Sequence, residues 1–96
     1  MLKIVLSSLA EQDLIDIWVY TAEQWSFEQA DNYSEQLVAG FESLIKHPQL
    51  GVARDDLCSG YMALTVSQHI AFYKVVADDI QIVRVLHKSV DRPRHL

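Results

Sequence analysis

Two capped amphipathic patterns follow each other with almost no chain between them, and this feature most restricts how the chain can fold. Ser8 opens a capping-box pattern, in which Ser is followed three residues later by Glu or Gln, and apolar residues then recur at helical spacing as far as Trp25. Ser26 opens the same pattern again, and a second apolar line runs to His47–Pro48, where a proline ends the helix. A break this short predicts a helical hairpin.

Strand-like runs lie on both sides of this hairpin. One run rich in Ile and Val precedes it at 2–6, and three follow it, at 61–67, 70–76 and 80–87, after a loop at 49–60. Short polar joints between the last three runs predict two β-hairpins. The order β-α-α-β-β-β predicts an α+β fold in which the N-terminal strand and a three-stranded antiparallel meander form one sheet packed on the helical hairpin. At 96 residues, the chain is expected to be a single domain spanning 1–96.

Charge is distributed unevenly along the chain. Residues 1–45 contain one Lys and eight acidic residues, whereas residues 46–96 carry a small positive excess, and the whole chain has a net charge of −5. An acidic protein is not held to nucleic acid by bulk charge, so no direct binding of DNA is expected. The C-terminal end is nevertheless basic, because Arg84, Lys88, Arg92 and Arg94 gather there.

The sequence predicts no disulfide, metal site, cofactor site, export signal or membrane span. Cys58 is the single cysteine, so an intrachain disulfide and a cysteine-based zinc cluster are excluded. The four His are scattered without ligand-like spacing, and there is no glycine-rich phosphate loop or Gly-x-Ser-x-Gly motif, so neither a metal site nor a cofactor is predicted. With no apolar run long enough for an export signal or a membrane span, a cytoplasmic protein is expected.

The last predicted hairpin raises one chemical hypothesis. A turn centred on 78–79 would place Tyr73 opposite Arg84 and His69 opposite Lys88 on one face of the sheet, and it would leave Ile70, Phe72, Val76, Val83 and Val85 to face the helices. In a ribonuclease, Arg would stabilise the charged transition state and His or Tyr would transfer protons. The structural alternative, favoured by the sequence alone, is that Arg84 pairs with a carboxylate, Tyr73 packs and the other two are solvated. A three-residue turn would shift the register and remove the cluster.

The run Ile82-Val83-Arg84-Val85-Leu86-His87-Lys88-Ser89-Val90-Asp91, with Arg94-His95-Leu96 at the end, resembles the C-terminal part of ParE toxins in the ParE/RelE superfamily. Shorter matches in the hairpin and the strands follow in the expected order. The resemblance implies a type II toxin–antitoxin system in which a partner, typically ParD-like, neutralises the toxin. ParE-type toxins inhibit DNA gyrase without being enzymes, whereas the RelE branch cleaves messenger RNA on the ribosome through basic side chains on the open sheet face.

The number of cations favours the ParE branch. The strands from 61 to 87 contain only Lys74 and Arg84, and Met62 stands where family members often have Arg. We therefore expect a non-enzymatic, plasmid-stabilising type of toxin that contacts gyrase. The residues expected to bind the target are Arg84, Lys88, Arg92, Arg94, His95 and Leu96. Two alternatives remain: a RelE-like nuclease that uses His69, Tyr73, Arg84 and Lys88, and a non-toxic binding module. The acidic hairpin and the basic tail both remain candidate surfaces for the antitoxin.

Overall fold

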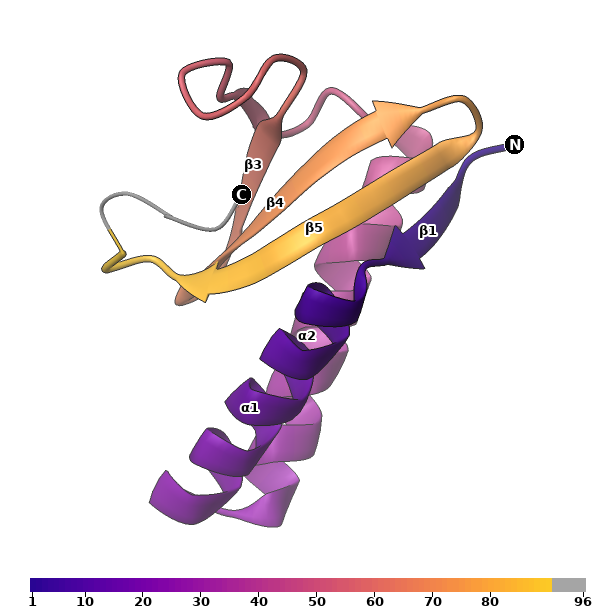
Figure 1. Cartoon of the computed structure of the whole chain (residues 1–96). Coiled ribbons are helices and arrows are strands. Elements are labelled where there is room, and N and C mark those ends of the chain that lie inside the picture. Colours follow the sequence, from indigo (N-terminus) through magenta and orange to yellow (C-terminus); the bar gives the residue numbers. More distant parts are fainter. Residues whose placement is uncertain (91–96) are drawn as a thin grey trace.

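A helical hairpin lies on one face of a five-stranded sheet in the computed structural model, which describes residues 1–90 (Figure 1). In chain order the elements are β1 (Lys3–Leu6), α1 (Ser8–Gln24), α2 (Phe27–Lys46), β2 (Val52–Ala53), β3 (Met62–Val66), β4 (His69–Val76) and β5 (Asp79–His87). The strand order is β1-β5-β4-β3-β2; β1 is parallel to β5, and the other pairings are antiparallel. The predicted α+β fold is confirmed, and β2 is an additional short edge strand.

A serine caps the N-terminus of each helix, but the first cap lies one residue earlier than predicted. The Ser7 side chain accepts the hydrogen bond of the Ala10 N–H, while the Ser7 N–H still continues the ladder to the carbonyl of Ile82. Ser7 therefore remains extended, and the helix starts at Ser8. Ser26 caps α2 as predicted, and α2 ends at Lys46 before the His47–Pro48 pair.

The hydrophobic core lies between the hairpin and the sheet. The helices contribute Ala10, Leu37, Phe41 and Leu44 to this core, and the sheet contributes Ala71, Tyr73, Ile80, Ile82 and Val85. Figure 1 shows both helices on the same side of the sheet, with the closed end of the hairpin extending beyond it. The hairpin tip therefore has surface on both sides that the core does not use.

The register predicted for β4 and β5 is wrong. The turn is centred on 77–78, so Val76 pairs with Asp79 and Tyr73 pairs with Ile82 instead of Arg84. An irregularity next to Tyr73 then shifts the pairing by one residue, and His69 lies opposite His87 instead of Lys88. The predicted faces change as well, because Tyr73 belongs to the core cluster whereas Phe72 is buried outside it. Turn position and bulge together set the register, and neither has a unique sequence signal.

Candidate functional site: a groove between hairpin tip and sheet

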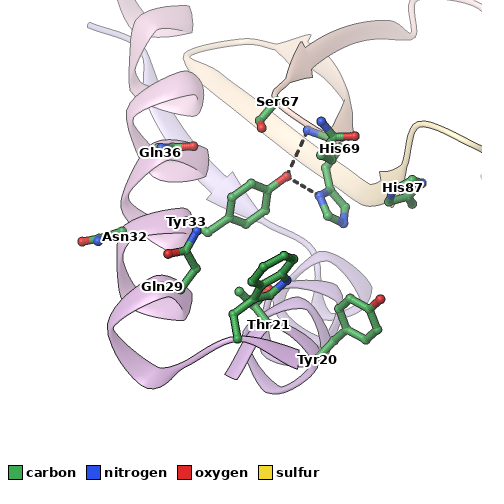
Figure 2. A pocket seen from close by; sticks show the side chains of 11 residues that line it. Tyr20, Thr21, Gln29, Asn32, Tyr33, Gln36, Ser67, His69 and His87 are labelled. Atoms are coloured by element: carbon green, nitrogen blue, oxygen red, sulfur yellow. Dashed lines mark hydrogen bonds between the residues drawn. The ribbon is translucent and has the colours of Figure 1, made fainter. Parts of the chain in front are cut away.

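A groove with a volume of about 490 Å³ lies where the hairpin tip passes the end of the sheet. It is lined by Tyr20, Thr21, Trp25, Gln29, Asn32, Tyr33, Gln36, Ser67, Gln68, His69 and His87 (Figure 2). The lining side chains are aromatic rings, carboxamides, hydroxyls and imidazoles, and none of them is a Lys, Arg, Asp or Glu. Trp25 is 74% exposed, so a large apolar surface borders the groove. This combination suits a peptide, because carboxamides can bond to a backbone while aromatic rings cover apolar side chains.

A hydrogen-bonded pair from two distant parts of the chain forms the wall of the groove. Tyr33, on α2, points toward the first residue of β4, and its Oη lies 2.6 Å from His69 Nδ1 (Figure 2). The same hydroxyl accepts the Gln68 backbone N–H at 3.1 Å. Burial lowers the pKa of His69 below its ordinary value of 6.5, and the nearby His87 lowers this pKa further. His69 is therefore held in its neutral form near neutral pH.

His87 extends this pair across the sheet. It is the cross-strand partner of His69, and the two rings meet edge to face with centroids 5.3 Å apart. The Ser89 N–H donates to His87 Nδ1 at 3.1 Å. The Ser89 hydroxyl lies 2.8 Å from the same nitrogen, so Ser89 fixes the orientation of the ring. The groove thus combines two imidazoles with a phenol, and none of its lining residues is a Lys or Arg that could stabilise the charged transition state of RNA cleavage.

Arg84 lies away from the groove in an ion pair with the first helix. Its Nε and a terminal guanidinium nitrogen donate to the two carboxylate oxygens of Asp13 at 2.7 and 2.8 Å, and the Val85 N–H donates to the same carboxylate at 2.9 Å. The two side chains are only 15% and 12% exposed. Hydrogen bonding to Asp13 raises the pKa of Arg84, so the guanidinium stays charged. The ion pair therefore joins β5 to α1, and the Arg84 guanidinium faces a carboxylate of its own chain.

Tyr73 is also engaged within the protein. Its ring is fully buried, and its hydroxyl donates to the Pro48 carbonyl at 2.9 Å and accepts the Gly51 N–H at 3.0 Å. Burial raises the pKa of Tyr73 above its ordinary value. Tyr73 thus fixes the loop after α2 to the centre of the sheet.

The structure does not bring the four predicted nuclease residues together. Arg84, Tyr73 and His69 each bond to a different partner, and Lys88 is exposed beyond the end of β5. The other residues predicted to bind a target, Arg92, Arg94, His95 and Leu96, lie outside the described residues. Within 1–90, no group of three or more His, Cys, Asp or Glu side chains is placed to hold a metal ion. Neither helix in that range is both long and apolar enough to cross a membrane.

The sequence reasoning missed Tyr33 and His87. One signal could have indicated the role of His87: His69 directly precedes the strand predicted at 70–76 and His87 ends the next, and an antiparallel hairpin brings such ends together. By its helical spacing Tyr33 is one of the apolar residues of α2, and its ring does lie beside the core. The part that its hydroxyl plays depends on how far α2 lies from β4, and periodicity carries no information about that distance.

Comparisons with known proteins agree with this fold. The family model described as "ParE toxin of type II toxin-antitoxin system, parDE" matches residues 4–92. A Toxin ParE1 of Caulobacter vibrioides is 38% identical over 91 residues, which cover 95% of this chain and 94% of the relative. A Toxin ParE1 of Mycobacterium tuberculosis is 34% identical over 95 residues, covering 98% and 97% respectively.

A solved structure described as "Chromosomal ParDE TA system from P. aeruginosa" contains a similar fold. The two chains superpose with a TM-score of 0.79 at 22% identity, over 91% of this chain and 96% of the other. At this level of identity the likeness bears on the fold alone. The family match and the two relatives cover nearly the whole sequence, and on these grounds the chain belongs to the ParE family of toxins of type II toxin–antitoxin systems.

Proposed function

We propose that this ParE-type toxin inhibits DNA gyrase by protein–protein contact and that a ParD-like antitoxin neutralises it. The observation that carries the proposal is the Asp13–Arg84 pair, in which the guanidinium that a nuclease would direct at RNA is bound to a carboxylate of its own chain. Family membership favours the same conclusion, because ParE-type toxins act on gyrase without catalysis.

The basic C-terminal end is the proposed contact with gyrase. Lys88 is exposed directly after β5, and Arg92, Arg94, His95 and Leu96 follow it in the sequence. Arg84 supports this end indirectly, because its pair with Asp13 fixes the last strand against α1. A positively charged end on an otherwise acidic protein would direct the toxin toward an acidic surface of the enzyme.

The gyrase assignment is tested with purified protein in a supercoiling assay. Full-length toxin is expected to block supercoiling, and a chain lacking 91–96 is expected to have lost most of this effect while keeping every strand of the sheet. The double substitution Arg92→Gln/Arg94→Gln separates charge from length. Full inhibition by the truncated chain would contradict the role of the C-terminal end. Cleavage of messenger RNA in a translating extract, lost in Arg84→Ala, would instead support a nuclease.

The groove is the proposed contact with the antitoxin. Its uncharged lining and the exposed ring of Trp25 suit an extended segment whose apolar side chains alternate with backbone hydrogen bonds. Trp25→Ser is expected to weaken the complex with the co-encoded antitoxin. Leu50→Ser is the matched control, because Leu50 is also an exposed apolar residue but lies in the loop after α2, away from the groove. Equal weakening by both substitutions would refute the role of the groove.

A further inference from the structure

Helix α1 carries apolar side chains on two faces, and only one of them packs against the core. The core-facing residues are Ala10, Leu14 and Ile17. A second line is formed by Ile15, Val19 and Ala22, whose spacings of four and three residues place them on one face of the helix. Ile15 is 56% and Val19 is 41% exposed. Ala22 is half-buried, and none of the three residues belongs to the core cluster or to the residues packed against it.

Two aromatic rings enlarge the exposed line into a patch that spans both helices. Trp18, three residues after Ile15, stacks on Phe27 with ring centroids 5.6 Å apart. Its indole N–H donates to Asp31 at 2.9 Å, which fixes the ring, and Phe27 itself is exposed. We name these five residues, Ile15, Trp18, Val19, Ala22 and Phe27, the outer patch. A contiguous apolar surface of this kind is typical of a site for another protein.

The surroundings of the outer patch are acidic. Glu11 lies one turn before Ile15, and Asp16 and Glu23 border the line along α1. Helix α1 contains no Lys or Arg, and α2 has a single one, Lys46, at its far end. A second copy of this chain would bring two acidic hairpins together, and like charges across an interface oppose association. The charge pattern therefore selects a positively charged partner.

We propose that the outer patch binds a basic amphipathic helix of the antitoxin, a role that rests on the toxin–antitoxin pairing proposed above. The apolar side of that helix covers Ile15, Val19 and the Trp18–Phe27 stack. Its Lys and Arg side chains reach Asp16 and Glu23 at the border. Helices that bind in this way place apolar anchors three and four residues apart, which matches the spacing of the outer patch. The antitoxin would then contact the hairpin tip on two sides, at the groove and at the outer patch.

The test measures the affinity of the co-encoded antitoxin for purified toxin by calorimetry. Ile15→Ser/Val19→Ser is expected to weaken binding at least about tenfold, since each covered aliphatic side chain contributes an affinity of roughly that size. Leu9→Ser is the matched control, because Leu9 is an exposed apolar residue of α1 outside the patch, and its affinity should remain that of the wild type. Circular dichroism verifies that each variant is folded.

A second pair of substitutions isolates the charge. Asp16→Asn/Glu23→Gln is expected to lower the affinity and to reduce its dependence on salt, because the ionic contacts are then missing. If the antitoxin binds the Ile15/Val19 variant as tightly as it binds wild-type toxin, the role of the outer patch is refuted and the toxin–antitoxin pairing stands. If the antitoxin does not bind wild-type toxin at all, the toxin–antitoxin pairing is refuted as well. A dimer of the free toxin that the Ile15/Val19 variant has lost would assign the patch to self-association instead.

Discussion

The Asp13–Arg84 pair makes a quantitative prediction for the substitution Asp13→Ala. The carboxylate accepts three hydrogen bonds, two of them from a guanidinium, and both side chains are at least 85% buried. Removing one partner of a buried ion pair costs about 3–5 kcal/mol, because the other charge remains without compensation. Residual exposure of Arg84 to water places the expected loss in unfolding free energy near the lower limit, at about 3 kcal/mol. For a domain of this size the melting temperature should fall by about 12 °C or more.

The assay is guanidinium-induced unfolding followed by tryptophan fluorescence, with Asp13→Ala, Arg84→Met and the double variant forming a cycle. The coupling energy should exceed about 1.5 kcal/mol, and the double variant should be less destabilised than the two single effects added together. Lys3→Ala is the control, because Lys3 is 71% exposed and its pair with Asp79 at 3.7 Å should contribute less than about 1 kcal/mol. If Asp13→Ala cost no more than Lys3→Ala, the pair would not hold β5 against α1.

Two further predictions concern the pKa of His69, and two concern the loop contacts of Tyr73 and Gly51. Because the pKa of His69 is lowered from 6.5, the unfolded chain binds this proton more readily, so the unfolding free energy should decrease as the pH falls below about 6.5. An NMR titration should show the pKa of His69 rising in His87→Gln, and an unchanged value would contradict the coupling. Tyr73→Phe should cost about 1–3 kcal/mol in denaturant unfolding, since two backbone groups lose their buried partner; a loss near zero would mean that water replaces the hydroxyl. Gly51→Ala should also lower the unfolding free energy by about 1–3 kcal/mol, because the added Cβ would lie 2.6 Å from the Tyr73 hydroxyl. Wild-type stability of this variant would show that the loop can move away without cost.

Much of the fold was predictable because the signals for it are local. Helix ends depend on side chains within one turn, and the Ser26 cap and the His47–Pro48 stop lie where they were predicted. Strand positions follow from short apolar runs, so β3, β4 and β5 were each predicted to within one or two residues. The first cap lies one residue earlier than predicted because a tertiary contact, the hydrogen bond from the Ser7 N–H to the Ile82 carbonyl of β5, keeps Ser7 extended.

The candidate site was less predictable, because it depends on register and on distances between elements. A turn one residue earlier than predicted and a bulge beside Tyr73 changed which side chains face each other. His69 thereby met His87 and Tyr33, while Tyr73 entered the core. Periodicity within a strand is the same for either register, so it could not distinguish these outcomes.

By itself the sequence determined the helical hairpin, the succession of the helices and the longer strands along the chain, and the acidic character of the hairpin, since each follows from neighbouring residues or from composition. It also carried the resemblance to ParE toxins. Only the tertiary structure decided that Arg84 is bound by Asp13, that a neutral groove forms around Tyr33 and His69, and that Ile15 and Val19 remain exposed. The physical reason is that partners far apart in the sequence are brought together by packing, and a helix with apolar residues on two faces does not by itself show which of them the core will cover.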